Sequence, residues 1–402
     1  MSEEKLVPKL RFSGFDDEWK SFKLSEISKR ITRKNKSLET DRPLTISAQY
    51  GLVDQIEYFN KIVASKSLKG YYLLNKGEFA YNKSYSNGYP FGAVKRLDDY
   101  ENGAISTLYI CFNTNDKMNS DLLKEYFETD KWHKEIYKIA VEGARNHGLL
   151  NVAVGDFFNT KHVLPTNNHE QEKIAKFLIE INTKIDLLEN KHKAYQDFKK
   201  YLMQKIFAQE LRFDFKDTWD KVLLKDVAFI PKKTKLTNIE GLKLLTVKLH
   251  TKGIEINDRI KPKLTKRGRP YYIRRSGELL IGRQNFHNGG MGIVPKSLDE
   301  GICSNAISSF NVFEDKIDVN YLYYFLARPE YYIKSERLIG GTGQKEFSEK
   351  ELLKLKIDLP SLEEQNKIVD FLSNIDHKIE LSENQLNKTQ EFKKGLLQQM
   401  FV

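Results

Sequence analysis

Residues 171–207 read QEKIAKFLIEINTKIDLLENKHKAYQDFKKYLMQKIF, and residues 365–401 repeat them as QNKIVDFLSNIDHKIELSENQLNKTQEFKKGLLQQMF. Aligned without a gap, 18 of the 37 positions are identical. An internal repeat of this kind indicates that the chain is built from two related halves.

Both copies carry seam residues spaced alternately by four and three positions, the period of a left-handed coiled coil. The first copy has these residues at Ile174, Leu178, Ile181, Ile185, Leu188, His192 and Tyr195, and the second at Ile368, Leu372, Ile375, Ile379, Ser382, Leu386 and Thr389. The spacing then changes, and we predict a shifted apolar stripe of Phe198, Leu202 and Ile206, matched by Phe392, Leu396 and Met400.

Each copy predicts one long helix, which would be about 55 Å long at about 1.5 Å per residue. A helix of this length is too long for one small domain to cover, so we predict that the two helices pack on each other as an intramolecular antiparallel coiled coil. The alternative is that each helix caps its own domain. Both helices begin with a capping pattern, Ser361 with Glu364 and a looser version of Asn167 with Glu170.

The composition bounds the class of protein. The chain has 402 residues, a formal net charge of +11 and two cysteines, Cys111 and Cys303. The positive excess makes polyanions plausible partners. Two cysteines without zinc spacing favour a reducing compartment. The first residues are polar and no apolar run reaches the roughly 20 residues of a membrane span, so we expect a cytoplasmic, nucleoid-associated protein.

The repeat extends beyond the helices. Arg11 and Trp19 correspond to Arg212 and Trp219, and a Gly-Glu pair precedes an apolar strand at residues 77–81 and again at 277–281. Strand and helix patterns follow in the same order in both halves. We predict a mixed α/β (α+β) fold with a pseudo-twofold repeat: domains at residues 1–164 and 209–358, and helices at 165–208 and 359–402.

Polar loops directly after each of these strands are the candidate binding site, because loops at strand ends commonly carry function. Residues 232–275 add 14 Lys or Arg against three acidic residues. Lys and Arg neutralise phosphates, whereas Arg, Gln and Asn can pair with guanine and adenine. The alternative is a solvated basic face. The candidate DNA-binding residues are Arg33, Lys34, Lys36, Tyr50, Asn82, Lys83, Tyr85, Asn87, Arg145, Asn146, Lys232, Lys233, Lys235, Arg283, Gln284, Asn285, His287, Asn288, Thr342, Gln344 and Lys345.

Motifs for catalysis are missing from the sequence. The glycine-rich residues 340–345 lack the spacing of a phosphate-binding loop, and no dinucleotide fingerprint, zinc-protease motif or nucleophile elbow occurs. An Asn- or Asp-Pro-Pro-aromatic run, which amino-methyltransferases use to hold an adenine, is also missing. We therefore expect a chain that is not an enzyme by itself and that binds no metal and no cofactor.

In the order of these features the chain resembles the specificity subunits of type I restriction-modification systems. The resemblance rests on the two Trp entries, the Gly-Glu strands, residues 341–344 and the Leu-Pro and Glu-Gln openings of both helices. It implies two target recognition domains, a helical spacer and a bipartite, asymmetric DNA target. The first half departs from the pattern at residues 143–146, where Gly-Ala-Arg-Asn replaces Gly-Thr-Gly-Gln.

The resemblance also implies partners. Two methyltransferase subunits would bring S-adenosylmethionine and methylate an adenine in each half-site, and two restriction subunits would bring ATP and magnesium. We expect docking on the outward helix faces, at Lys173, Glu180, Lys184, Glu189, Lys367, Lys378 and Glu383. Two other functions stay open: a bifunctional DNA methyltransferase, and a coiled-coil assembly protein that binds DNA without sequence preference.

Overall fold

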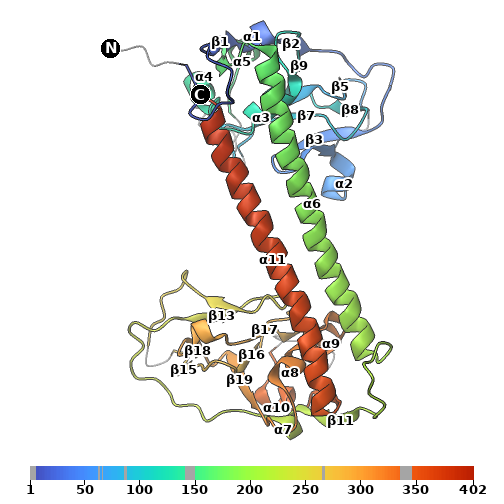
Figure 1. The fold of residues 1–402 in the computed structure, drawn as a ribbon, viewed down its shortest axis with the longest axis vertical. Coiled ribbons are helices and arrows are strands. Elements are labelled where there is room, and N and C mark those ends of the chain that lie inside the picture. The colour runs from blue at the N-terminus through green and yellow to red at the C-terminus, as the bar shows by residue number, and fades with distance from the viewer. Residues whose placement is uncertain are drawn as a thin grey trace. The chain divides into compact units, whose positions relative to one another are not determined.

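The chain divides into two compact units in the computed structural model, which describes residues 6–61, 64–65, 67–85, 88–140, 150–264, 268–335 and 346–402 (Figure 1). Unit 1 contains Met1–Glu189 and Asn384–Val402, and unit 2 contains Asn190–Glu383. Each unit therefore holds one mixed α/β domain together with part of both long helices. The domain limits expected from the sequence, which keep each helix whole, stay a prediction.

Unit 1 forms three sheets. Its strands are β1 (Lys20–Lys23), β2 (Ser28–Ile31), β3 (Pro43–Ser47), β4 (Gly51–Asp54), β5 (Tyr72–Asn75), β6 (Phe79–Asn82), β7 (Ala93–Arg96), β8 (Asn102–Ile105), β9 (Ile110–Thr114) and β10 (Lys161–Leu164). The orders are β1-β10, β2-β9-β6-β7 and β4-β3-β8-β5. The short helices are α1 (Leu24–Ile27), α2 (Gln55–Phe59), α3 (Ser120–Tyr126), α4 (His133–Ile139) and α5 (Val154–Asn159).

Unit 2 repeats this plan. Its strands are β11 (Asp220–Leu223), β12 (Ala228–Phe229), β13 (Leu245–Val247), β14 (Ile254–Ile256), β15 (Tyr271–Ile273), β16 (Leu279–Gly282), β17 (Met291–Ile293), β18 (Ile302–Ser304), β19 (Ile307–Val312) and β20 (Lys356–Leu359). The helices are α7 (Leu224–Val227), η1 (Phe286–Asn288), η2 (Lys296–Leu298), α8 (Val319–Leu326), α9 (Pro329–Ser335) and α10 (Glu349–Leu352). The order β12-β19-β16-β17 matches β2-β9-β6-β7.

The second sheet differs between the units. In unit 1, β3 and β8 pair in parallel and join four strands into one sheet. In unit 2 a parallel bridge from Leu244 to Ile302 takes the place of that pair, so β13-β14 and β15-β18 remain separate two-stranded antiparallel sheets. In both units two short helices follow the central sheet: a turn separates α3 from α4, and α8 ends at Leu326 before α9 begins at Pro329.

The central strand of each unit separates two layers of core. Side chains alternate across a strand, so Phe79 and Tyr81 of β6 pack in the core that contains the long helices, whereas Ala80 packs against the second sheet. In unit 2, Leu279 and Ile281 face the helix core and Leu280 the opposite one. Burial on both faces explains why these strands read as continuous apolar runs.

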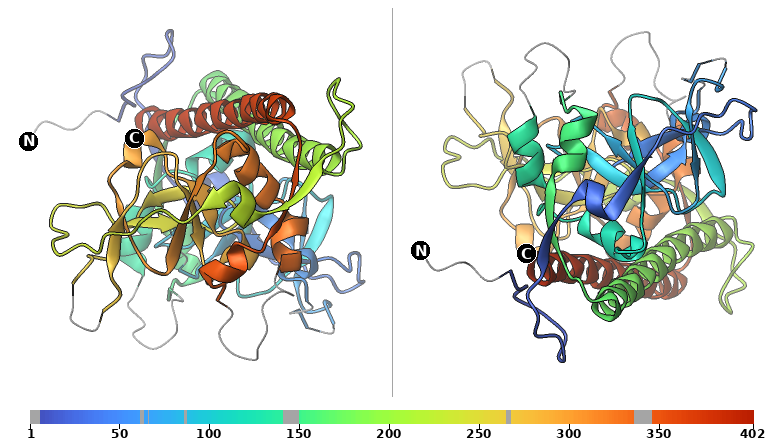
Figure 2. Two further views of the ribbon diagram at one scale, coloured as in Figure 1. Left: turned by 90° about the horizontal axis from the view of Figure 1, so that it is seen from below. Right: turned by 90° about the horizontal axis from the view of Figure 1, so that it is seen from above.

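The long helices are α6 (Asn168–Phe207) and α11 (Leu362–Met400). They are antiparallel within each unit: the Gln390 amide donates to Glu189 (3.1 Å) in unit 1, and His192 contacts Ser382 (2.9 Å) in unit 2. The two views in Figure 2 show the strands of each unit beside these helices. Over the described residues, no helix combines the length and apolarity needed to cross a membrane.

The structure corrects the shifted apolar stripe that we predicted near the C-terminal ends of the two long helices. Leu202, Ile206, Leu396 and Met400 are buried as predicted, but Phe198 and Phe392 are 50% and 57% exposed. Spacing by four and three continues unbroken instead through Lys199 and Lys393, which are mostly buried. The prediction was wrong because it placed the apolar Phe next to each Lys at the seam. The structure places the Lys there instead, and each Lys has an ion pair.

The first turns of the long helices anchor the domains. Ser361 caps α11 as expected, but the Glu364 carboxylate does not complete a capping box; it accepts from Arg212 (2.9 and 2.6 Å) and Trp219 (3.1 Å). Unit 1 repeats this with Glu170, Arg11 and Trp19. The hydrogen bonds to Glu170 raise the pKa of Arg11, and those to Glu364 raise the pKa of Arg212.

Candidate nucleic-acid interface

The central strand of each unit delivers a polar loop to the sheet edge. Gly77 and Gly277 both have a φ of +88°, which favours glycine, and this turn starts the buried strands β6 and β16 as the sequence predicted. Directly after each strand a basic residue leaves the sheet, Lys83 in unit 1 and Arg283 in unit 2. An equivalent turn and strand thus position the candidate loop of each unit.

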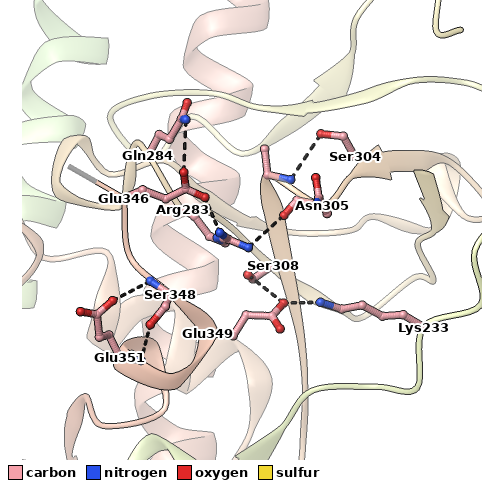
Figure 3. Close-up of polar contacts among 11 residues, drawn as sticks. Lys233, Arg283, Gln284, Ser304, Asn305, Ser308, Glu346, Ser348, Glu349 and Glu351 are labelled. Carbon is pink, nitrogen blue, oxygen red and sulfur yellow. Dashed lines mark hydrogen bonds and ion pairs between the residues drawn. The ribbon is translucent and has the colours of Figure 1, made fainter. Parts of the chain in front are cut away.

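Arg283 and Gln284 converge on one carboxylate in unit 2 (Figure 3). Glu346 pairs with the Arg283 guanidinium and accepts from the Gln284 amide at 3.4 Å. Arg283 also donates to the Asn305 carbonyl at 3.3 Å. These contacts hold Arg283 and Gln284 side by side, and an Arg beside a Gln offers donors suited to guanine and adenine edges.

Lys233 reaches the same region from the opposite side of the loop cluster (Figure 3). Its ammonium pairs with Glu349, which also accepts from the Ser308 hydroxyl at 3.1 Å. Burial favours the neutral acid, but the contacts with Lys233 and Ser308 outweigh it and lower the pKa of Glu349. Glu349 is therefore ionised at neutral pH and fixes the position of one basic group of the interface.

The remaining loop residues of unit 2 form one 3₁₀ turn. Asn285 is exposed and precedes the turn, and its carbonyl accepts from the Asn288 amide (3.0 Å). His287 and Asn288 are half-buried and contact each other at 3.1 Å through Nε2 and Nδ2. Asn285 is thus the exposed amide of the turn, whereas His287 and Asn288 partly face the protein.

Unit 1 has a matching but less charged loop. The Asn82 side chain accepts from the Ser84 amide at 3.0 Å, Lys83 donates to the Val152 carbonyl at 3.5 Å, and Tyr85 is 59% exposed. The Leu150 amide donates to the Lys83 carbonyl (2.9 Å), as the Phe347 amide does to the Arg283 carbonyl (3.0 Å). In each unit the candidate loop therefore lies beside an equivalent segment of the chain, which contains Leu150 in unit 1 and Phe347 in unit 2.

Asn87, Arg145, Asn146, Thr342, Gln344 and Lys345 lie outside the described residues. Leu150 and Phe347, however, follow the sequence segments that contain five of these six residues, and both touch the post-strand loops. Their assignment to the interface stays a prediction.

The basic residues near the start of unit 1 are spread over its second sheet. Arg33 donates to the Leu73 carbonyl (3.1 Å) and pairs with Glu78 (2.8 Å), whereas Lys34 donates to the Gly70 carbonyl (2.8 Å) and lies over the Tyr72 ring. Lys36 is exposed and Tyr50 is 68% exposed. Arg33 and Lys34 are thus held to β5 and its flanks, and only Lys36 and Tyr50 extend freely into solvent.

The basic stretch at 232–275 is largely open. Lys248 and Arg275 have acidic partners. Lys232, Lys235, Lys252, Arg259, Lys261 and Lys263 are exposed, and none has an ion pair in the part of the chain that the structure describes. Such cations are available to neutralise phosphates. Metal ligands do not gather in the described regions, where no three His, Cys, Asp or Glu side chains form a group that could hold an ion.

The interface also contains residues that sequence reasoning missed. Glu346 and Glu349 neutralise the two cations that approach the loop, and Ser308 of β19 supports Glu349. Glu346 is 63 positions from Arg283, so no local spacing links them. The available signal was weak: acidic residues directly follow the glycine-rich segment of the second half.

The chain is similar to known proteins in sequence and in fold. Residues 216–391 match the sequence model of the type I restriction modification DNA specificity domain. The second half of the chain thus carries a domain of this family. It is 24% identical, over 405 aligned residues, to the type I restriction enzyme MjaVIII specificity subunit of Methanocaldococcus jannaschii, covering 95% of this chain and 91% of that protein.

Solved structures share the fold over nearly the whole length. The type I restriction-modification S subunit from M. genitalium is 15% identical with a TM-score of 0.58, covering 98% of this chain and 99% of that one. A chain from a structure on the complex assembly and conformational transition of the type I R-M system is 17% identical, with a TM-score of 0.54. The match covers 95% of this chain and 97% of that one. This chain thus shares its fold with these solved structures along nearly its whole length.

Proposed function

We propose that this specificity subunit reads a bipartite DNA target, one half-site per unit, as the sequence recognition component of a type I restriction-modification complex. The observation that carries the proposal is the repeated site: in each unit a buried strand ends in a polar loop held against the segment after residues 149 or 345. The loops differ in sequence, Lys-Ser-Tyr against Arg-Gln-Asn. Different reading groups imply an asymmetric target.

In this proposal base reading and phosphate binding belong to different residues. Arg283, Gln284 and Asn285 supply the donors that fit base edges, and the open cations of 232–275 supply phosphate contacts. Arg283 has to exchange Glu346 for a base, because one guanidinium edge cannot serve both. That exchange penalises sequences that give Arg283 no acceptor in return.

Methyl transfer and cleavage are assigned to partner subunits. Two methyltransferase subunits would carry S-adenosylmethionine and modify an adenine in each half-site, and restriction subunits would carry ATP and magnesium. The sequence supports this through its missing methyltransferase and nucleotide-binding motifs. This chain would position the enzymes and bind no cofactor itself.

The helix surfaces support two docking sites. Lys173, Glu180, Lys184, Glu189, Lys367, Lys378 and Glu383 are all exposed, which docking requires. The repeat adds exposed apolar residues at matching positions: Leu187 (65%) with Leu381 (54%), and Phe198 (50%) with Phe392 (57%). Leu187 and Phe392 belong to unit 1, and Phe198 and Leu381 to unit 2. Two similar sets of exposed apolar side chains fit two copies of one partner.

The deciding experiment maps adenine methylation in cells that express this chain with its methyltransferase, against cells that lack only this chain. A two-part motif with an unspecified gap should disappear with the chain. Unchanged methylation would refute the proposal in favour of the assembly protein. Labelled-methyl transfer by the purified chain alone would instead favour the bifunctional enzyme, and equal, salt-sensitive affinity for all DNA would favour non-specific binding.

A further inference from the structure

Each unit contains a polar contact between its domain and both long helices, buried in unit 1 and partly exposed in unit 2, where the Asp376 side chain is 39% exposed. In unit 1, Glu125 of α3 is 1% exposed; its carboxylate accepts from the Asn182 amide of α6 at 2.7 Å and lies 3.0 Å from the Lys393 ammonium of α11. In unit 2, Asp376 of α11 lies 2.5 Å from the Lys199 ammonium of α6 and accepts from the Tyr324 hydroxyl of α8 at 2.7 Å.

The two contacts occupy equivalent positions of the repeat. Asn182 and Asp376 each follow the anchoring Gln, Gln171 or Gln365, by eleven residues, and Lys199 and Lys393 follow it by 28. These glutamines accept from the backbone of the N-cap residues Asn119 (2.7 Å) and Asp318 (2.9 Å), and Glu125 and Tyr324 each lie six residues beyond. The Lys of each contact therefore occupies the equivalent position of the repeat, Lys393 in unit 1 and Lys199 in unit 2.

What differs is which element supplies the negative charge. In unit 1 the domain supplies the carboxylate and the helix supplies a neutral amide. In unit 2 the helix supplies the carboxylate and the domain supplies a neutral hydroxyl. Burial, and then the charge of Asp376 with its hydrogen bond, raise the pKa of Tyr324, so this hydroxyl is a donor at neutral pH. Each Lys thus has one carboxylate in its contact.

We propose that the position of the carboxylate, on the domain in unit 1 and on the helix in unit 2, matches each recognition domain to its own pair of helix segments. A domain carrying Glu125 placed in unit 2 would bring a second carboxylate against Asp376. A domain carrying Tyr324 placed in unit 1 would leave the Lys393 ammonium beside Asn182 without a carboxylate. Both mismatches leave an uncompensated charge in these contacts, at a largely buried position in unit 1 and at a partly exposed one in unit 2, which is destabilising.

The match has a consequence that rests on the proposed function. A polar residue at a coiled-coil seam position commonly specifies register and pairing. Here it would also fix which domain comes first along the helices, and hence the order of the two half-sites.

Thermal unfolding of the full chain tests the match without DNA. Glu125→Gln and Asn182→Asp should each lower the Tm by about 5 °C or more, because each unbalances a buried pair. Together they should restore at least half of the summed loss, because they recreate the unit 2 arrangement in unit 1. Thr183→Asp, which adds the same charge at the exposed neighbouring residue, should change the Tm by about 1–2 °C at most. Additive losses in the double variant would overturn the proposal.

A domain exchange gives the second measurement. Residues 20–164 and 220–359 are exchanged in the full chain, with and without the pair Asn182→Asp and Asp376→Asn. The charge changes should raise the Tm and the folded yield of the exchanged chain, although they lower both in the original chain. No gain in the exchanged chain contradicts the match. Because neither experiment measures methylation, failure of the match and failure of the DNA-reading function remain distinguishable.

Discussion

The buried His162 is expected to make unit 1 sensitive to acid. His162 of β10 is 1% exposed between the Tyr126 hydroxyl (3.1 Å) and the Thr160 hydroxyl (2.8 Å), and burial lowers its pKa to about 4. The unfolded chain protonates this residue near its ordinary pKa of about 6.5. The unfolded state therefore binds more protons between these values, and stability is lost as the pH falls from about 6.5 towards about 4.

The repeat offers the matched variant for this effect. Ile357 takes the equivalent place in β20, fully buried. His162→Ile should reduce the acid-induced loss in the free energy of unfolding by up to about 3 kcal/mol between pH 7 and pH 4. The lost contact with Tyr126 adds a constant offset. Denaturant unfolding at several pH values separates slope from offset, and an unchanged slope would assign the acid sensitivity elsewhere.

Arg283 is expected to read one half-site. Arg283→Ala removes the guanidinium and should reduce affinity for the correct half-site by about 1–3 kcal/mol, or roughly 5- to 150-fold, while the other half-site keeps its discrimination. Asn285→Ala should act on the same half-site. Binding is measured with DNA altered in one half at a time.

Lys235→Ala is the matched control for Arg283, because this exposed Lys is expected to contact only phosphates. It should weaken all DNA by a similar factor and reduce the salt slope by about one. If Arg283→Ala behaves in the same way, Arg283 binds phosphate and does not read bases.

The long helices should provide two separate docking sites. Phe198→Ser and Phe392→Ser remove exposed rings, so the Tm should change by about 2 °C or less. Each variant should weaken one of two methyltransferase copies by about tenfold or more, since interface aromatics dominate binding. Native mass spectrometry should then show mainly a 1:1 complex for either variant and a 2:1 complex for the parent.

Tyr137→Ser is the control for the helix variants, because Tyr137 is 73% exposed but belongs to α4 and not to a long helix. It should retain the 2:1 complex. If neither Phe variant changes the stoichiometry, docking does not use these helix positions.

For the whole molecule, helix length is expected to set the gap between half-sites. Both long helices pass from one unit into the other along the sequence. One heptad inserted in both helices keeps the seam in phase and adds about 10 Å, or about three base pairs. The methylated motif should lengthen its gap accordingly. A four-residue insertion rotates the seam and should abolish methylation. An unchanged gap with the heptad insertion would contradict the length rule.

The sequence alone was sufficient for features with a local period. The repeat, the two long helices and the strands after Gly77 and Gly277 are confirmed, because heptad spacing, glycine turns and runs of apolar residues depend on neighbours along the chain. Capping was predicted only in part: Ser361 and Asn167 accept from the first turn, but Glu364 and Glu170 bind partners more than 140 residues away.

Only the tertiary structure decided which charges meet. Arg283 with Glu346, Lys233 with Glu349, and Glu125 with both Asn182 and Lys393 come from separate elements, and no spacing rule connects them. It also decided that Lys199 occupies the helix seam while Phe198 faces solvent, because a buried ammonium is acceptable only where folding supplies a carboxylate. Local pattern therefore determined the elements of this protein, and the pairing of distant charges determined how its domains and candidate loop side chains are held.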